Sequence, residues 1–153
     1  MKRMAFCLMG LMAVLTAMAQ PRVGHTYNIC DASGRMLTIK DAAREHDALL
    51  CMSAADAEAA WTQVWALTDA TGQGKLFTLV NPETWMAVDQ AETTATKALL
   101  TWDAEQTNSN QQFIIKETEG GILLGNSQGK YVSEQEDGTI KMDDKGTVFS
   151  FVE

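Results

Sequence analysis

Side chains that could take part in covalent chemistry are few in this chain of 153 residues. His25 and His46 are its two histidines, and their spacing does not match a metal site. Cys30 and His46 could form a nucleophile–base pair, but both fall in predicted turns and no third group is placed to orient the histidine. No glycine-rich phosphate loop is present. We therefore predict that the protein is not an enzyme and uses no metal and no cofactor.

Tryptophans offer another chemistry, because an indole face can pack against an apolar ligand surface. Thr101 and Asp103 flank Trp102, which predicts that this indole lies at the surface. Trp85 follows a turn and is either an exposed contact residue or a partly buried residue at the rim of the core. Trp102 is therefore the aromatic residue that we expect to meet a ligand.

The elements that would position these side chains belong to an internal repeat. Three segments align without a gap, at 27–39, 77–89 and 122–134. Each begins with apolar residues at alternate positions, which is typical of a strand with one buried face. A turn follows in each copy, opened by Asp31, Asn81 or Asn126, whose side chains can bond the backbone two residues on. A second strand is predicted to begin at Met36, Met86 and Tyr131.

The repetition continues beyond this block. The Ala-Leu-Leu triplet at 48–50 recurs at the same offset at 98–100, and the third copy has a shorter strand at 139–141 after a hairpin signal. Every copy ends on an aromatic strand, at 63–67, 111–115 and 147–151. Residues 53–60 have helical propensity, and we expect a loop there with a single helical turn. Each unit is thus predicted to contain four short strands, about twelve in all.

Threefold repetition of such a unit favours a closed barrel, because one four-strand unit cannot bury its apolar face or protect its edges alone. Three four-strand units predict an all-β fold, the β-trefoil, as a single domain over 20–153 with repeats at 24–72, 73–120 and 121–153. A three-bladed propeller is disfavoured, since propellers have four or more blades. The predicted core consists of alternating residues from the first and last strands of each unit: Tyr27, Ile29, Trp65, Leu67, Phe77, Leu79, Phe113, Ile115, Ile122, Leu124, Phe149 and Phe151.

The repeat ends resemble the Gln-x-Trp motif of ricin-B-type lectin domains. Gln63-Val64-Trp65 matches it, Gln111-Gln112-Phe113 replaces tryptophan by phenylalanine, and the third copy keeps only the aromatic residue. The resemblance covers the whole chain after residue 19 as a repeat pattern. It implies a carbohydrate-binding module whose sites use an aspartate in the second strand, an aromatic platform after the third, and an Asn-Gln pair.

Transferred to this sequence, the resemblance gives one candidate carbohydrate site, in the second repeat: Asp89, Trp102, Asn110 and Gln111. In the gapless alignment the acidic position falls on Val88, so Asp89 would serve only if a bulge intervened. The first copy has Thr38 and Met52 at the corresponding positions, and the third has Ser133 and no Asn-Gln pair. Gln63 and Gln111 are expected to be structural, with their amides bonding the backbone between strands.

Residues 1–19 have the character of a signal peptide, with Lys2 and Arg3 before an apolar stretch that ends in Ala-Met-Ala. We therefore expect a secreted or periplasmic protein without membrane insertion after cleavage, and a monomer. Removing Lys2 and Arg3 from the 12 basic residues leaves ten, against 20 acidic residues. This acidity argues against nucleic acids as partners. In an oxidising compartment Cys30 and Cys51 could pair, and the sequence leaves the pairing open.

Two other functions remain possible from the sequence. The domain could have lost sugar binding and act as a protein-interaction module or protease inhibitor, with contacts from the loops at 41–47 and 90–97. An enzyme that depends on His46 or Cys30 is the third alternative. Glycan or glycoprotein is the partner that the resemblance favours.

Overall fold

The computed structural model describes residues 20–91 and 97–153, which contain twelve strands and three short 3-10 helices. The predicted signal peptide lies outside the described residues. The first four strands are β1 (Thr26–Cys30), β2 (Met36–Ile39), β3 (Leu50–Ser53) and β4 (Trp65–Asp69). The next four are β5 (Phe77–Val80), β6 (Met86–Asp89), β7 (Leu100–Asp103) and β8 (Ile114–Thr118). The last four are β9 (Gly121–Gly125), β10 (Tyr131–Glu134), β11 (Ile140–Asp143) and β12 (Ser150–Val152).

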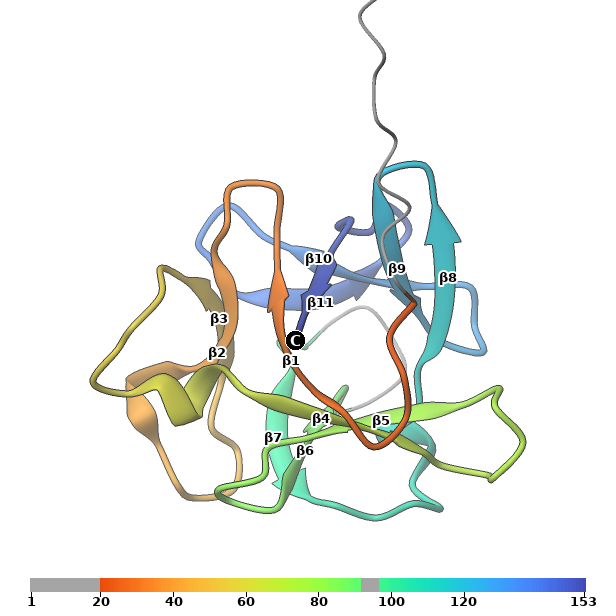
Figure 1. Cartoon of the computed structure of the whole chain (residues 1–153), viewed down its shortest axis with the longest axis horizontal. Coiled ribbons are helices and arrows are strands. Elements are labelled where there is room, and N and C mark those ends of the chain that lie inside the picture. The colour runs from red at the N-terminus through yellow and green to blue at the C-terminus, as the bar shows by residue number, and fades with distance from the viewer. Residues whose placement is uncertain (1–19, 92–96) are drawn as a thin grey trace, which may run out of the picture.

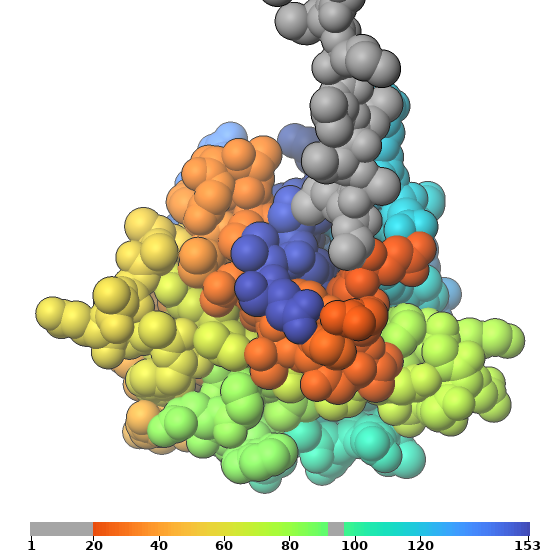
Figure 2. Space-filling model, in the orientation of Figure 1, coloured from red at the N-terminus to blue at the C-terminus, as the bar shows by residue number. Residues whose placement is uncertain are grey.

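The first and last strands of each unit form a closed six-stranded barrel. β1 pairs with β12 and β4, β4 with β5, and β8 with β9, all antiparallel. Single bridges between Phe77 and Phe113 and between Ile122 and Phe149 complete the ring. The hairpins β2–β3, β6–β7 and β10–β11 form three lobes around it (Figure 1). The predicted β-trefoil is therefore confirmed, and the β1–β12 pair brings the first and last described segments together on one face (Figure 2).

The barrel interior holds the predicted aromatic residues, with Trp65, Phe113 and Phe149 each no more than 1% exposed. The other predicted core residues are also buried, except Phe77 and Ile115, which are partly buried and pack against the core. The sequence prediction omitted the hairpins' contribution to the core. Leu50, Leu99 and Ile140 meet where the three lobes join, through backbone bonds from Leu50 N to Leu99 O (3.1 Å) and from Leu99 N to Ile140 O (2.8 Å).

The three predicted turns are closed by the side chains that open them. Asn81 Oδ1 accepts from the backbone of Glu83 and Thr84, and Asp31 and Asn126 do the same in their own turns. Two of these amides also bond the preceding repeat: Asn126 Nδ2 donates to Gln90 Oε1 (3.0 Å), and Asn81 Nδ2 donates to Trp61 O (2.7 Å). The turn residues therefore join the repeats as well as closing the hairpins.

The remaining sequence expectations have mixed outcomes. The helical turn expected within 53–60 begins only at its end, as the 3-10 helix η2 (Ala60–Gln63). Cys30 and Cys51 are both free thiols, because β2 lies between their strands, and burial raises the pKa of each. Across the residues that the structure describes, no helix is long and apolar enough to span a membrane.

Candidate functional site

The segment between the first paired residues of β5 and β6 has one residue more than the corresponding segments of the other two repeats. This difference sets the register of the second repeat. Asp31 N bonds Arg35 O and Asn126 N bonds Lys130 O, but Asn81 N reaches one residue further, to Met86 O (2.8 Å). The added residue is accommodated by Trp85, which has a φ of 60° and donates its N–H to Asn81 O (2.9 Å). The gapless alignment of the second copy was therefore wrong after this turn.

The corrected register moves Asp89 to the acidic position. Ala87 pairs with Val80, as Met36 pairs with Cys30 and Tyr131 with Gly125. Counting from these partners, Asp89 is equivalent to Thr38 and Ser133, and Val88 is equivalent to Leu37 and Val132. Val88 accordingly points into the core, and no bulge within β6 is needed to place Asp89. The longer turn performs the shift that the prediction assigned to a bulge.

Trp102 is shifted in the same way. It pairs with Ala87, whereas Ser53 pairs with Met36 and Asp143 with Tyr131, so Trp102 corresponds to Ser53 and not to Met52. Its neighbour Thr101 takes the inward position and is buried. Alternate residues of paired strands share a face. Because Asp89 pairs with Leu100, Asp89 and Trp102 lie on the same outer face of the β6–β7 hairpin.

Gln111 holds Asp89 in place from the following segment. Gln111 Nε2 donates to Asp89 Oδ2 (3.0 Å) and to Asp103 O (2.8 Å), while its Oε1 accepts from Glu105 N (2.8 Å). The other Asp89 oxygen accepts from Ala91 N (2.7 Å). Gln111 is fully buried and Asp89 is 4% exposed. The expected structural role of Gln111 is thus confirmed, and its contact with a ligand could only be indirect.

Gln63 plays the same part in the first repeat. Its Nε2 donates to Thr38 Oγ1 (3.1 Å) and to Ala54 O (2.8 Å), and its Oε1 accepts from Asp56 N (3.0 Å). The third repeat has no such glutamine, and Ser133 Oγ instead accepts from Gly146 N (2.7 Å) and bonds the Asp143 carboxyl group. The polar position in the second strand is therefore held in all three repeats, and it carries a carboxyl group in the second.

Asn110 lies in the 3-10 helix η3 (Ser109–Gln111), which Asn108 caps by accepting from Asn110 N (3.0 Å). Its side chain is half-buried, and Nδ2 donates to Ala91 O (3.2 Å). Ala91 is thereby held by Asp89 at its N–H and by Asn110 at its carbonyl. We refer to Asp89, Trp102, Asn110 and Gln111 as the second-repeat site. Hydrogen bonds link Asp89 to Gln111 and, through Ala91, to Asn110, and Trp102 lies on the same face of the hairpin as Asp89.

His46 is a component of this site that the sequence analysis did not identify. Its imidazole lies on the Trp102 indole with 4.5 Å between ring centroids, and its Nε2 lies 2.8 Å from Asp103 Oδ1. Asp47 N also donates to Thr101 O (3.0 Å), which ties the 41–47 loop to β7. Trp102 keeps 36% of its surface exposed, in agreement with its predicted surface position. No local signal relates His46 to Trp102, because they belong to different repeats.

The second-repeat site combines groups that are able to bind a ligand non-covalently. A carboxyl group, an amide and an indole face can hold a ligand that presents hydroxyl groups and an apolar ring face. Cys30 lies in β1 and not in a turn as expected, and His46 contacts Trp102 and Asp103 rather than a thiol. Within residues 20–91 and 97–153, no three His, Cys, Asp or Glu side chains gather as a metal site would require.

No protein-family model matches the chain, and no curated protein matches it by sequence. Its structure is similar to that of ThreeFoil, a designed three-fold symmetric protein, with a TM-score of 0.70, 17% identity and coverage of 84% of this chain and 98% of that one. The Rhizoctonia solani agglutinin gives a TM-score of 0.68 at 15% identity, covering 89% of this chain and 98% of that one. The Polyporus squamosus lectin gives 0.67 at 17% identity, covering 86% of this chain and 50% of that one. The predicted resemblance to ricin-B-type domains is thus confirmed at the level of the fold, and the chain is a β-trefoil.

Proposed function

We propose that this protein is a secreted, monomeric carbohydrate-binding module without catalytic activity, and that the second-repeat site holds the sugar. The observation that carries the proposal is that Asp89 and Trp102 share the outer face of the β6–β7 hairpin, with Asp89 bonded to the buried Gln111 and linked through Ala91 to Asn110. A sugar ring would pack its C–H face on the indole and offer hydroxyl groups to the carboxyl and amide groups.

The structural neighbours support this choice of ligand class. They include an agglutinin and a lectin whose structure holds the epitope Neu5Acα2-6Galβ1-4GlcNAc. The net charge of −8 favours neutral over anionic ligands. The 41–47 loop does not favour the alternative function, a protein-interaction module, because His46 and Asp47 hold that loop against β7.

The test is a glycan array followed by calorimetric titration of the chain without residues 1–19. Methyl β-galactoside and Galβ1-4GlcNAc are the first probes. Trp102→Ala and Asp89→Asn should each weaken binding at least tenfold, about 1.4 kcal/mol, and Trp102→Tyr should retain it because a ring remains. Asp89→Asn sets an amide N–H against either Ala91 N or Gln111 Nε2, so thermal unfolding of this variant must first show that it is folded. Absence of saccharide binding, or binding unchanged by Trp102→Ala, would refute the site.

Secretion is tested separately. The full chain, expressed in a Gram-negative host, should appear outside the cytoplasm with Gln20 as its first residue by mass spectrometry. Retention of an intact N-terminus in the cytoplasm would contradict the signal peptide.

A further inference from the structure

A cleft of about 360 Å³ opens on the outer face of the second repeat, beside the second-repeat site. Its floor is the outward face of β4 and β5, with Ala66 and Val80 as apolar residues. One wall is the β5–β6 turn with Trp85, and the opposite wall is the segment that follows β7, including Glu105 and Gln106. We call this the Trp85 cleft. Its volume is that of a small ligand-binding pocket.

Two positions next to the cleft carry small side chains: Ala66 and Ala87 stand where the following unit has Ile114 and Tyr131. Paired residues form one row across four strands: Ala66 at the end of the first repeat, then Val80, Ala87 and Trp102 of the second. The equivalent row is Ile114 at the end of the second repeat, then Gly125, Tyr131 and Asp143 of the third. In the third repeat the Tyr131 ring lies over Gly125, with a ring carbon 3.3 Å from the position that a Cβ on residue 125 would take. Lys116 Nζ lies 5.6 Å from the centroid of the Tyr131 ring. The Tyr131 ring therefore covers this part of the third repeat. Ala87, at the equivalent position of the second repeat, has no ring.

Trp85 is held at the rim of the cleft in an unusual way. Its side chain is 74% exposed, and its backbone occupies the left-handed region at a φ of 60°. A bulky residue is rare there and is strained. The flanking turn is fixed by Asn81, and the opposite wall is fixed by Gln111, which bonds Glu105 N, and by Gln112, whose Nε2 donates to Gln106 O (2.8 Å). The indole is thus displayed to solvent between two anchored walls.

The charged and amide groups of the cleft lie at its edge. On the floor, the Thr68 and Thr78 hydroxyls bond each other across β4 and β5, which uses one of their two protons. Glu105 and Gln106 are exposed on the far wall. A ligand that fits has a flat apolar face for the indole and floor, and hydroxyl groups at its edge for a carboxylate and an amide. A pyranose ring has this distribution.

The cleft adjoins the second-repeat site along the β6–β7 pair. Met86, next to Trp85, pairs directly with Asp103, next to Trp102, and the buried Gln111 borders the cleft and bonds Asp89. We propose that the Trp85 cleft is a second saccharide subsite, so that the second repeat binds an oligosaccharide of which one ring packs on Trp102 and another on Trp85. This inference rests on the proposed function and extends it to the length of the ligand.

The test compares saccharides of increasing length: methyl β-galactoside, Galβ1-4GlcNAc and the tetrasaccharide that joins two such units. The wild-type chain should bind the tetrasaccharide at least tenfold more tightly than the monosaccharide. Trp85→Gly removes the ring and suits the left-handed backbone, and should abolish this gain while leaving monosaccharide affinity within twofold. Trp85→Tyr, which keeps a ring, should retain most of the gain. Thermal unfolding of each variant checks that the fold is intact.

Indole N–H resonances provide an independent readout, since the chain has four tryptophans. The tetrasaccharide should shift the signals of Trp85 and Trp102 and leave that of the buried Trp65 unchanged, whereas the monosaccharide should shift only Trp102. Tetrasaccharide binding that Trp85→Gly leaves within twofold of wild type would overturn the subsite while the proposed function stands. Failure of every saccharide to bind the wild-type chain would overturn both.

Discussion

The His46 imidazole lies on the Trp102 indole, with ring planes inclined by 41° and 4.5 Å between centroids, so the first repeat partly covers the aromatic platform of the second. The Asp103 carboxyl group, 2.8 Å from His46 Nε2, holds the ring there. His46, which has no role in the repeat pattern, therefore covers part of Trp102, the aromatic residue that the pattern places at the candidate site.

His46→Ala should expose Trp102 with little effect on stability. Both partners of the His46–Asp103 pair are largely exposed, so its loss should lower the free energy of unfolding by less than about 1 kcal/mol. Acrylamide quenching of tryptophan fluorescence should increase, because the face of Trp102 becomes accessible. The same substitution at His25, whose partner is Glu153, is the control and should leave quenching unchanged. Equal quenching in the two variants would contradict the stacked arrangement.

Trp85→Gly should stabilise the protein. A left-handed conformation costs a non-glycine residue about 1–2 kcal/mol, and the greater backbone freedom of glycine in the unfolded chain offsets part of this gain. Since the indole is mostly exposed, little apolar burial is lost, and we expect a net gain of about 0.5–1 kcal/mol in urea unfolding. Gly34→Ala is the converse control: Gly34 has a φ of 86°, and its substitution should be destabilising. A destabilised Trp85→Gly variant would show that the indole makes a stabilising contact.

Gln111→Ala should lower the free energy of unfolding more than most single substitutions of polar residues in this fold. It removes the hydrogen bonds that Gln111 makes with Asp89 Oδ2, Glu105 N and Asp103 O, and leaves the buried Asp89 carboxyl group with Ala91 N alone. We expect a loss of about 3 kcal/mol, since an unsatisfied buried group costs about 1–3 kcal/mol and three groups are affected. Asn110→Ala removes one bond of a half-buried side chain and should cost about 1 kcal/mol. Equal losses in urea unfolding would contradict the central position of Gln111.

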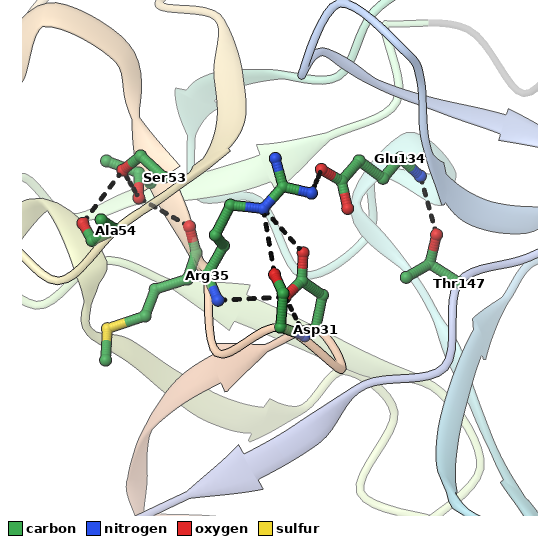
Figure 3. A network of polar contacts seen from close by, with 9 residues as sticks. Asp31, Arg35, Ser53, Ala54, Glu134 and Thr147 are labelled. Carbon is green, nitrogen blue, oxygen red and sulfur yellow. Dashed lines mark hydrogen bonds and ion pairs between the residues drawn. The ribbon is translucent and has the colours of Figure 1, made fainter.

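The contact between the first and third repeats should give the stability a dependence on pH. Arg35 lies between Asp31 and Glu134, with its Nε 3.2 Å from Asp31 Oδ2 and its Nη2 bonded to Glu134 (Figure 3). Burial acts to raise the pKa of Asp31, but hydrogen bonds from Ser33, Glu134 and the Arg35 backbone lower it overall. The pKa of Glu134 is raised by burial and by its hydrogen bond with Asp31, against the attraction of Arg35.

The two carboxyl groups therefore act in opposite directions. Asp31 stabilises the fold above its unfolded pKa, near 3.8, and this contribution is lost as the pH falls through its lower folded pKa. Glu134 stabilises the fold below its unfolded pKa, near 4.5, and this contribution is lost as the pH rises through its higher folded pKa. Glu134→Gln should thus reduce the loss of stability above about pH 4.5, and Asp31→Asn should reduce the acid-induced loss below about pH 4.

The second repeat supplies the matched replacement for this pair. Asn126 and Gln90 occupy the equivalent positions at the next repeat contact and bond each other at 3.0 Å. The double variant Asp31→Asn with Glu134→Gln should fold and show a flatter dependence of unfolding free energy on pH between 3 and 7 than the wild type. An unchanged pH profile would show that these two groups do not determine it.

Much of the fold follows from local patterns. Alternating apolar residues with an Asp or Asn after each strand predicted where the second strands begin, because side-chain direction in a strand depends only on its period of two. The aromatic ends of the repeats were correctly predicted as core. The buried role of Gln63 and Gln111 could also be expected, since a buried amide must be satisfied by nearby backbone groups.

The sequence by itself determined the three-repeat β-trefoil, its barrel core and the identity of the polar residues in the second-repeat site. The tertiary structure decided the register of that site, because an alignment without gaps cannot detect one extra turn residue at Trp85, and a shift of one residue reverses every side chain that follows. It also decided that His46 covers Trp102 and that a cleft lies beside Trp85. Both arise from packing between strands and loops far apart in the chain, where the separation in sequence carries no information on distance in space.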